Sequence, residues 1–472
     1  MRKIKPPQET IGKICGNQKI KDGFVRFSRY VFPVPCDDGM LLYHTMTGEL
    51  LHLGHEEWIQ LSGDTYVWIP AVKDDTHQKT ELDTDRNSMS DSNGLFSELT
   101  RKWFLIPEAF DEYTHASQIL SVVKLLEPKR SEICSFRIFT TTDCNARCFY
   151  CYEIGRSRLT MSKQTAYDVA QYIAGIHGNK KVKLSWFGGE PLVNGQAIRI
   201  ICSEMKRLGI DYYSTMTSNG YLFNENNVRE AAEEWKMKSV QITLDGTEDV
   251  YNRTKAYVYK DGSAYQRVLK NIELLLDAGI EVSIRLNMCQ GNIEDMKALA
   301  DELGSRFTGS RKPAVYVALL REYVNHVDTL SNAEGFAAEM ALVKKLEASA
   351  LYKKQYLPSK LRLSYCMADN DGTVTIMPDG SLGKCEHFYE DHLIGSIYPN
   401  KVSIGRDERD AEIAYWKERM DIPECRKCML FPTCTTLKHC PYTEDDCTEY
   451  DRMRQKQQLK ARILNEYNRY RA

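Results

Sequence analysis

The stretch CNARCFYC, residues 144–151, carries three cysteines within eight residues and follows a hydrophobic run. Iron-sulfur clusters are held by closely spaced thiolates, and a four-iron cluster normally takes one thiolate for each iron. Three local thiols therefore leave one iron open to a small molecule. The alternative is a zinc site. Paired C-x2-C units are typical of zinc, whereas gaps of three and then two residues separate these cysteines.

At these residues the chain resembles the radical S-adenosylmethionine (radical SAM) superfamily, whose signature is C-x3-C-x-aromatic-C. The resemblance covers about residues 130–450. It implies that Cys144, Cys148 and Cys151 hold a [4Fe-4S] cluster, with Tyr150 at the aromatic position beside the cofactor. It further implies that the open iron chelates S-adenosylmethionine and that an electron from the cluster cleaves it to a 5′-deoxyadenosyl radical. A flavodoxin or ferredoxin is implied as electron donor.

The overall composition bounds the classes of function. The 472 residues suffice for two or three domains, and the formal net charge of −2 gives no case for binding nucleic acid or an anionic membrane. The first ten residues, MRKIKPPQET, lack an apolar segment, and no run of about 18 apolar residues occurs. We therefore expect a cytoplasmic protein with no membrane partner.

Fifteen cysteines, mostly clustered at short spacings, favour metal binding over disulfides in a reducing compartment. Free cysteine otherwise behaves as a small hydrophobic residue. The five cysteines outside the clusters are therefore expected to be buried or inert thiols: Cys15, Cys36, Cys134, Cys202 and Cys289.

An N-terminal module is predicted over residues 1–125. Apolar runs at 40–43 and 50–53 flank a glycine-containing turn and predict a β-hairpin, followed by a helical pattern from His55. The polar stretch 74–94 predicts a mobile surface loop, and 95–107 a helix running into a short strand. This order resembles winged-helix modules that bind a leader peptide at a sheet edge. The alternative is a small α+β cap that only packs on the main domain.

Strand and helix patterns alternate over residues 126–330 and predict an α/β fold of βαβ units. The resemblance implies the same architecture, a partial (β/α)6 TIM-like barrel that is open on one side. Helices are predicted at 166–176 and 271–277. The predicted strands are 136–141, 182–187, 212–217, 239–244, 281–286 and 314–320.

Unusual residues follow the carboxyl ends of these strands, where α/β folds place their chemistry. Gly188 and Gly189 let the backbone approach a ligand, and Glu190 offers a carboxylate to an ammonium group. A lone GGE is more often a turn with a surface acid. In this position it resembles the superfamily's GGEP motif, which implies that Glu190 holds the amino group of S-adenosylmethionine.

Further cofactor contacts are predicted on the next strands. Ser218 resembles the residue that binds the cofactor's carboxylate or ribose in relatives. Strand alternation puts Arg285 and Asn287 on one polar face, where Arg285 could pair with the cofactor's carboxylate. Asp245 is a candidate catalytic acid or base. For all of these the alternative is a polar residue at a solvated opening.

A helical bridge is predicted at 331–360, and a third region at 361–472. In this region Cys366, Gly380 and Cys385 fit C-x13-G-x4-C, and a C-x2-C-x5-C-x5-C-x6-C pattern follows. This resembles the SPASM extension of radical SAM enzymes, which houses two auxiliary [4Fe-4S] clusters, so that three clusters are expected in all. A zinc ribbon is the alternative. The cysteines of the second pattern are Cys425, Cys428, Cys434, Cys440 and Cys447.

The resemblance implies Cys366, Cys385 and Cys440 for the first auxiliary cluster and the other four cysteines for the second. Seven thiolates leave one iron without a cysteine, which water, another side chain or a substrate thiolate could fill. The gap between Cys434 and Cys440 is longer than the usual three residues and puts their division in doubt. Glu386 stands where sulfatase-maturing relatives carry a proton-accepting aspartate, although it could be a surface acid. Residues 449–472 predict a charged helix without functional signal.

The expected function is that of a radical SAM/SPASM maturase of the sactipeptide or ranthipeptide type. Such an enzyme binds a precursor peptide by its leader and joins cysteine thiols to backbone or side-chain carbons as thioethers. A carbon-carbon cross-linking peptide cyclase is the nearest alternative. A formylglycine-forming sulfatase maturase and a non-catalytic iron-sulfur or zinc scaffold that binds peptides are the others.

Overall fold

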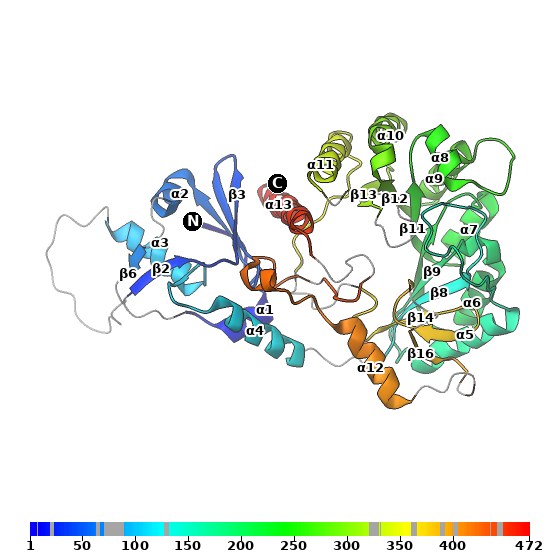
Figure 1. Cartoon of the computed structure of the whole chain (residues 1–472), viewed down its shortest axis with the longest axis horizontal. Coiled ribbons are helices and arrows are strands. Elements are labelled where there is room, and N and C mark those ends of the chain that lie inside the picture. Colours follow the sequence, from blue (N-terminus) through cyan, green and yellow to red (C-terminus); the bar gives the residue numbers. More distant parts are fainter. Residues whose placement is uncertain are drawn as a thin grey trace.

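A computed structural model describes residues 1–6, 8–18, 23–62, 67–69, 89–126, 132–320, 330, 332–359, 366–387, 392–398, 400, 405–434, 436–440 and 447–472. The chain forms an N-terminal module of two small sheets and a large α/β domain (Figure 1), and the C-terminal segment lies between and against both.

The large domain is built on a nine-stranded sheet in the order β13-β12-β11-β10-β9-β8-β14-β15-β16. The run from β8 to β13 is parallel throughout. Because β13 and β16 stand at opposite ends, the sheet does not close on itself. The six predicted strands are confirmed as β8 (Ser135–Thr141), β9 (Val182–Gly188), β10 (Tyr212–Ser218), β11 (Met237–Leu244), β12 (Glu281–Met288) and β13 (Ala314–Leu319).

Amphipathic helices cover this sheet. In α6 (Gly195–Arg207), residues Ala197, Ile198, Ile201 and Met205 recur at helical spacing and are buried, because their face lies against the sheet. Cys202 is buried with them, as expected of an inert thiol. The predicted helices are confirmed as α5 (Lys163–Ile176) and α9 (Ala264–Asp277). The other segments are η1 (Pro191–Asn194), α7 (Glu225–Glu233), α8 (Glu248–Lys255), η2 (Gln290–Asn292), α10 (Ile293–Arg306) and α11 (Ala333–Ala348).

The C-terminal segment extends the same sheet. Strand β14 (Thr373–Ile376) lies parallel to β8, with Thr375 opposite Arg137. Strand β15 (Ser381–Gly383) then pairs antiparallel with β14, and β16 (Leu393–Ser396) pairs antiparallel with β15. The remaining elements are α12 (Arg406–Lys417), η3 (Pro423–Lys427) and α13 (Glu449–Arg471). The C-terminal segment, which carries seven cysteines, is therefore hydrogen-bonded through β14 to β8, the strand that leads into the CNARCFYC loop.

The N-terminal module contains the predicted hairpin, now β4 (Gly39–His44) and β5 (Leu50–Gly54), within the sheet β1-β5-β4-β3. A second sheet has the order β6-β2-β7. The helix predicted from His55 is α2. The module's other elements are β1 (Arg2–Lys5), α1 (Glu9–Cys15), β2 (Gly23–Phe27), β3 (Val31–Cys36), α2 (His55–Ser62), β6 (Val67–Ile69), α3 (Met89–Arg101), β7 (Leu105–Pro107) and α4 (Glu112–Leu126).

The prediction of a mobile loop over residues 74–94 is wrong for residues 89–94. Residues 89–94 form the first turns of α3, and residues 74–88 lie outside the described residues. The mostly polar composition of residues 89–94 gives no helical pattern of apolar residues, and the buried Leu95 and Leu99 come only after it.

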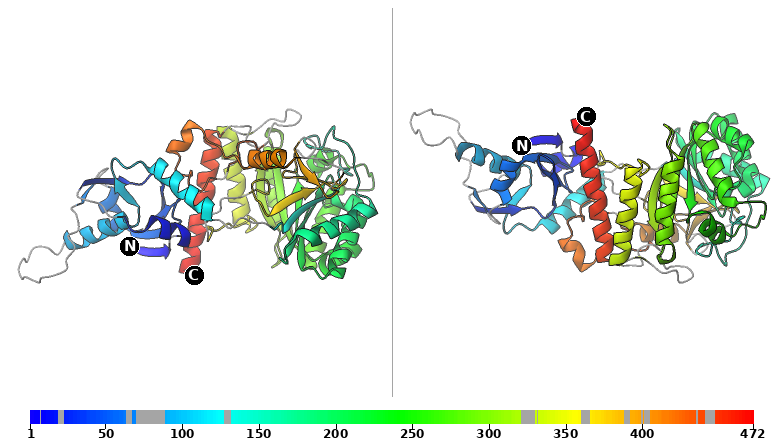
Figure 2. Two further views of the ribbon diagram at one scale, coloured as in Figure 1. Left: turned by 90° about the horizontal axis from the view of Figure 1, so that it is seen from below. Right: turned by 90° about the horizontal axis from the view of Figure 1, so that it is seen from above.

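Helix α13 joins the module to the rest of the chain (Figure 2). Its residues Ile463 and Tyr467 are buried in one cluster with Val34 and Leu41 of the module. On another side, its Arg454 pairs with Glu339 of α11 at 2.7 Å, and both side chains are about nine-tenths buried. Within the described ranges, no helix combines the length and apolar character that crossing a bilayer requires.

Candidate active site

The three cysteines of the CNARCFYC loop lie at the carboxyl end of β8. The Arg147 amide donates to the Lys255 carbonyl at 2.8 Å and so ties the loop to the end of α8. From the end of β10, the Asn219 amide group donates to Asn145 Oδ1 at 2.7 Å and approaches Cys144 Sγ at 3.7 Å. The loop is thus fixed by later strands and helices, as a rigid metal-binding loop requires.

Burial perturbs all three thiols of this loop. It raises the pKa of Cys144 to about 12 and that of Cys151 to about 11, and it also raises the pKa of Cys148. Raised pKa values do not favour a nucleophilic role for these thiols, because the thiolate is the reactive form. A coordinating metal would convert them to thiolates.

Gly188 and Gly189 bring the second loop against the cysteine loop. A Cβ on Gly188, whose φ is +132°, would stand 2.1 Å from the Thr141 carbonyl oxygen, and one on Gly189 would stand 2.3 Å from that of Asp143. The amides of Gly189 and Glu190 donate to these same two oxygens at 3.1 and 2.9 Å. The close approach predicted for these glycines is therefore made to the chain's own backbone.

Glu190 is fully buried beside this contact. Its carboxylate accepts hydrogen bonds from the Leu192 amide (3.1 Å), the Ser218 hydroxyl (3.0 Å) and the Asn219 amide (2.8 Å). Burial nevertheless raises the pKa of Glu190 to about 7. A carboxylate has about four lone-pair sites, so three donors leave about one for a further cation. Ser218, predicted to touch the cofactor directly, here orients Glu190.

A second buried network holds Tyr150. Its hydroxyl donates to Asp245 at 2.7 Å and accepts from Lys255 at 3.1 Å. Lys255 also pairs with Asp245 at 2.9 Å, and Asn287 donates to Asp245 at 3.1 Å. Burial opposes the charge of Lys255, but Asp245 and Cys148 outweigh it and raise the pKa of Lys255 above its ordinary value. Asp245 and Asn287 therefore support the cysteine loop, and their predicted roles toward substrate and cofactor stay predictions.

Arg285 fits a bound anion. It lies on β12, and its buried Nε has no hydrogen-bond partner among the described residues. A buried guanidinium nitrogen without a partner is costly unless a ligand satisfies it. The carboxylate of S-adenosylmethionine is of the right chemistry, so the residues here fit the cofactor that the sequence implies.

The structure brings Cys366, Cys385 and Cys440 together. Burial, then Glu386 and the two other cysteines, raise the pKa of Cys385 above its ordinary value. Cys440 also packs against the buried cluster that contains Cys385 and Trp416. Their role as ligands of one auxiliary cluster stays a prediction.

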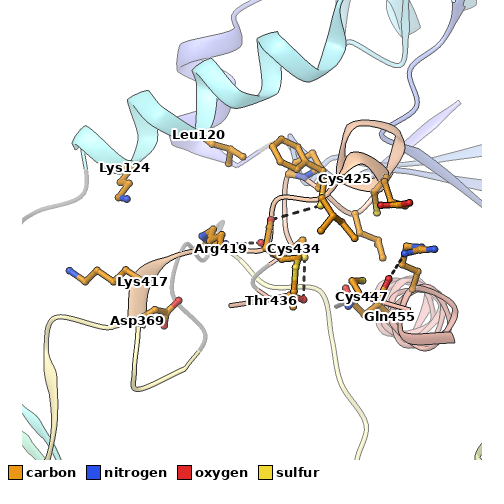
Figure 3. A pocket seen from close by; sticks show the side chains of 18 of the residues that line it. Leu120, Lys124, Asp369, Lys417, Arg419, Cys425, Cys434, Thr436, Cys447 and Gln455 are labelled. Carbon is orange, nitrogen blue, oxygen red and sulfur yellow. Dashed lines mark hydrogen bonds between the residues drawn. The ribbon is translucent and has the colours of Figure 1, made fainter. Parts of the chain in front are cut away.

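Cys425, Cys428, Cys434 and Cys447 line one cavity of about 570 Å³ (Figure 3). Helix α4 contributes Leu120 and Lys124 to its wall, and the loop before β14 contributes residues 369–371. The four cysteines of the predicted second auxiliary cluster thus surround a single space. Cys434 lies with this group and Cys440 lies near Cys385, and their assignment to separate clusters stays a prediction.

Among the described residues, no three of these ten cysteines bring their sulfurs within 4.8 Å of one another. The choice between two auxiliary clusters and a zinc ribbon at the C-terminal cysteines stays a prediction.

The cysteine loop and the segment after Cys385 touch each other. The rings of Tyr152 and His387 have centroids 4.3 Å apart, and Arg156 donates to the His387 carbonyl. Glu386, the predicted acid or base, pairs with Arg137 of β8. Sequence reasoning missed Arg137, His387, Asn219 and Lys255, because a single polar residue far from its partner along the chain gives no spacing signal.

Comparison with known proteins gives the following similarities. A family model described as "Radical SAM superfamily" matches residues 138–303. A "Probable GTP 3',8-cyclase" of Archaeoglobus fulgidus is 26% identical over 274 residues, which cover 54% of this chain and 86% of that protein. The "Radical SAM cyclopropyl synthase TigE" of Paramaledivibacter caminithermalis is 23% identical, and the match covers 52% of this chain and 54% of that protein.

Among solved structures, "Native anSMEcpe with bound AdoMet and Cp18Cys peptide" superposes with a TM-score of 0.54 at 15% sequence identity. The match covers 72% of this chain and 99% of that chain. At this identity the likeness shows a shared fold.

Proposed function

Residues 138–303 form a radical SAM domain and the chain is a radical SAM enzyme; from this premise we propose that it modifies a ribosomally made peptide by forming thioether cross-links. The observation that carries the proposal is the contact between the CNARCFYC loop and the segment after Cys385, through Tyr152 and His387. A substrate that binds beside this contact would meet both cysteine sites at once.

Cys144, Cys148 and Cys151 would hold the cluster that binds S-adenosylmethionine, with Glu190 facing its amino group and Arg285 its carboxylate. When bound, the cofactor supplies a radical that takes a hydrogen atom from the substrate, and an auxiliary cluster supplies an electron acceptor and a position for a thiolate. The asymmetry of the auxiliary sets, three cysteines in one and four in the other, supports a thiol substrate, because the smaller set leaves one iron for it.

Within this site the chain's own residues orient and enclose the reactants. Gly188 and Gly189 let the loop at residues 188–190 hydrogen-bond to the backbone at Thr141 and Asp143. These bonds hold Glu190 in place relative to the cysteine loop. Lys255 and Asp245 fix Tyr150 behind the loop. Glu386 would accept the proton of the substrate thiol or carbon, and its partner Arg137 would orient the Glu386 carboxylate before this transfer.

A peptide substrate is also supported by the N-terminal module. At one edge of its larger sheet, β3 contains Pro33 and Pro35, which lack amide donors, and it packs against α13. The other edge is β1, with the sequence RKIK. We propose that an extended leader adds as a strand to β1, where its own acidic residues would complement Arg2 and the lysines. The anSMEcpe structure, named with a bound peptide, agrees with a peptide in this fold.

The test uses the iron-reconstituted enzyme and a cysteine-containing precursor peptide encoded beside its gene. We expect 5′-deoxyadenosine and the loss of two hydrogens from the peptide for each cross-link. The cysteine thiols of the modified peptide should no longer react with an alkylating reagent. Cofactor cleavage without any loss of hydrogen from the peptide would refute the proposal. A peptide that loses hydrogens after every cysteine is replaced would instead favour the carbon-carbon cross-linking alternative.

Two variants separate the sites. Replacing Cys144, Cys148 and Cys151 by Ala should abolish cofactor cleavage and remove about a third of the iron, because one of three four-iron clusters is lost. Replacing Cys366 and Cys385 by Ala should leave cofactor cleavage and abolish the thioether. GTP, the substrate named for the Archaeoglobus relative, is the control substrate and should not be consumed.

A further inference from the structure

A second set of metal-ligating side chains lies on the N-terminal module, outside the site described above. Cys36 ends β3, Asp38 lies in the turn between β3 and β4, and His52 is on β5. Their ligand atoms all lie within 4.8 Å of one another. Sequence reasoning treated Cys36 as an inert thiol, because its partners are contributed by a turn and a neighbouring strand.

Two of the three distances between the ligand atoms match those of a tetrahedral metal site, and the third is at most 4.8 Å. Cys36 Sγ is 3.5 Å and His52 Nε2 is 3.2 Å from Asp38 Oδ1. With zinc bonds of about 2.3 Å to sulfur and about 2.0 Å to oxygen and nitrogen, the tetrahedral angle puts sulfur and oxygen about 3.5 Å apart and nitrogen and oxygen about 3.3 Å apart. No rearrangement of the backbone is therefore needed to admit the ion.

His52 points into this set. Its side chain is 8% exposed, and its Nε2 makes no hydrogen bond with any described residue, although it lies close to the Asp38 carboxylate. A buried ring nitrogen directed at a carboxylate and a thiol, without hydrogen-bond geometry to either, is placed as a ligand would be. The pairing of β4 with β5, with Leu41 opposite His52, holds it in position.

Helix α13 lies beside β3 (Figure 1) and supports the same carboxylate. The Tyr467 hydroxyl donates to Asp38 at 2.7 Å, and the Tyr467 ring stacks on His52 with centroids 5.4 Å apart. Arg471 lies 3.8 Å from the second carboxylate oxygen. A ligating carboxylate that is itself hydrogen-bonded is typical of metal sites, and here the bond crosses from the module to α13.

We infer that Cys36, Asp38 and His52 bind one Zn²⁺ ion, which fastens the N-terminal module to helix α13. One sulfur, one nitrogen and one oxygen ligand suit a borderline metal such as zinc rather than Mg²⁺ or Ca²⁺, which prefer oxygen. Thiolate and carboxylate together balance the charge of the ion. The fourth position faces solvent, because the Asp38 side chain is 42% exposed, and water completes the coordination there.

This inference is independent of the proposed peptide chemistry, so its test measures metal content. Iron-loaded enzyme is treated with a mild chelator, incubated with Zn²⁺ alone and desalted, and zinc and iron are measured by elemental analysis. We expect about one zinc per chain in the wild type, and loss of that zinc with unchanged iron in Cys36→Ser and Asp38→Asn. Both positions are partly exposed, so neither change should prevent folding.

Matched controls are available beside the site. Asp37→Asn changes the neighbouring residue of the same turn, and Cys15→Ser removes another thiol of the module; both should keep the zinc. Tyr467→Phe should weaken zinc binding by about 10-fold, because a hydrogen bond to a ligating carboxylate is worth about 10–100-fold in metal affinity. Hydrogen exchange at 31–54 and 459–471 should slow with zinc in the wild type and not in Cys36→Ser.

Absence of stoichiometric zinc in the wild type would overturn the inference. Equal zinc in the wild type and in both site variants would overturn it as well, since the ion would then be bound at the cluster cysteines. If the control variants lost zinc to the same extent as Cys36→Ser, the inference would also be overturned, because the loss would not depend on the three proposed ligands.

Discussion

At the scale of single residues, the buried ion pair Lys255–Asp245 makes the active site sensitive to substitution. Its side chains are 4% and 1% exposed and lie 2.9 Å apart. Removing one partner leaves the other charge buried alone, which costs about 3–5 kcal/mol. We expect Lys255→Met to destabilise the radical SAM domain by about this amount and to lower the iron content, because Tyr150 loses its donor. Thermal unfolding and elemental analysis measure the two effects.

The control for this pair is the double variant Lys255→Met/Asp245→Asn, which removes both charges. It should recover a large part of the lost stability, and a double variant as unstable as Lys255→Met would contradict the role assigned to the pair. Asp245→Asn alone also tests the catalytic role predicted from the sequence. If Asp245 acts on the substrate, cofactor cleavage should persist while peptide modification is lost.

His44 makes the N-terminal module sensitive to acid. It is 1% exposed between Tyr30 and Phe104, and burial lowers its pKa from 6.5 to about 3. Between these values the unfolded chain binds a proton that the folded module does not, so stability present above pH 6.5 is lost as the pH falls. The slope approaches about 1.4 kcal/mol per pH unit.

The measurement is the unfolding temperature of wild type and His44→Gln between pH 5 and 7. Gln can still accept the bond that His44 Nδ1 takes from the Thr47 amide at 3.2 Å, and it does not titrate. The difference between the two proteins should therefore shrink or change sign toward pH 5. A difference that is independent of pH would mean that His44 takes up its proton equally in the folded and the unfolded chain, which would contradict the prediction.

Residue identity was predictable from the sequence wherever spacing encodes chemistry. Cys144, Cys148 and Cys151 lie on one loop, so their spacing alone indicates a shared ligand. Arg137 and its partner Glu386 are separated by 249 positions along the chain, and Tyr150 and Lys255 by 105. Such pairs form only when the sheet brings its strand ends together, so no local pattern reports them.

At the scale of elements, the six parallel strands were predictable because short segments with apolar residues at alternate or successive positions recur between helical patterns. Strand β14 was not, because its four residues are too short for a pattern and its partner β8 lies in another domain of the sequence. The start of α3 was not predictable either, because residues 89–94, MSDSNG, are mostly polar, whereas the helix from residue 95 onward was predicted.

The β14–β15 hairpin positions Cys385, and its turn depends on Gly380. The φ of Gly380 is +89°, and a Cβ there would lie 2.8 Å from both Ile397 and Tyr398. We expect Gly380→Ala to displace the hairpin, lower the iron content of the auxiliary site and leave cofactor cleavage intact, since the radical SAM domain keeps its own cysteines. The cost of such a backbone position is about 1–3 kcal/mol before any clash is counted.

Gly395→Ala is the matched control on β16. Its φ is also positive, at +148°, but a Cβ there meets its nearest neighbour, Leu382, only at 3.9 Å. Iron content and cofactor cleavage are measured on both variants. Equal loss of iron in the two would show that positive φ, and not crowding against Ile397 and Tyr398, makes Gly380 necessary.

At the scale of the whole molecule, α13 is the element that unites the parts. The sequence predicted a charged helix without a role, because most of its residues are polar or charged and its few apolar residues form no clear pattern. In the structure Ile463 is fully buried against the module, and Arg454 is buried against α11. One helix thus contacts both the domain proposed to hold the leader and the domain proposed to modify the peptide.

Ile463→Asp should separate these two parts. A carboxylate in this apolar cluster has no partner, so the contact should weaken by at least about 3 kcal/mol. We expect limited proteolysis to release the N-terminal module, cofactor cleavage without peptide to stay at the wild-type rate, and modification of a full-length precursor to fall at least 10-fold. A precursor without its leader should be modified equally by both proteins.

Gln457→Asp adds the same charge at an exposed position of α13 and should change none of these properties. If Ile463→Asp released the module and left modification of the full-length precursor unchanged, the module would not be the part of the molecule that presents the peptide.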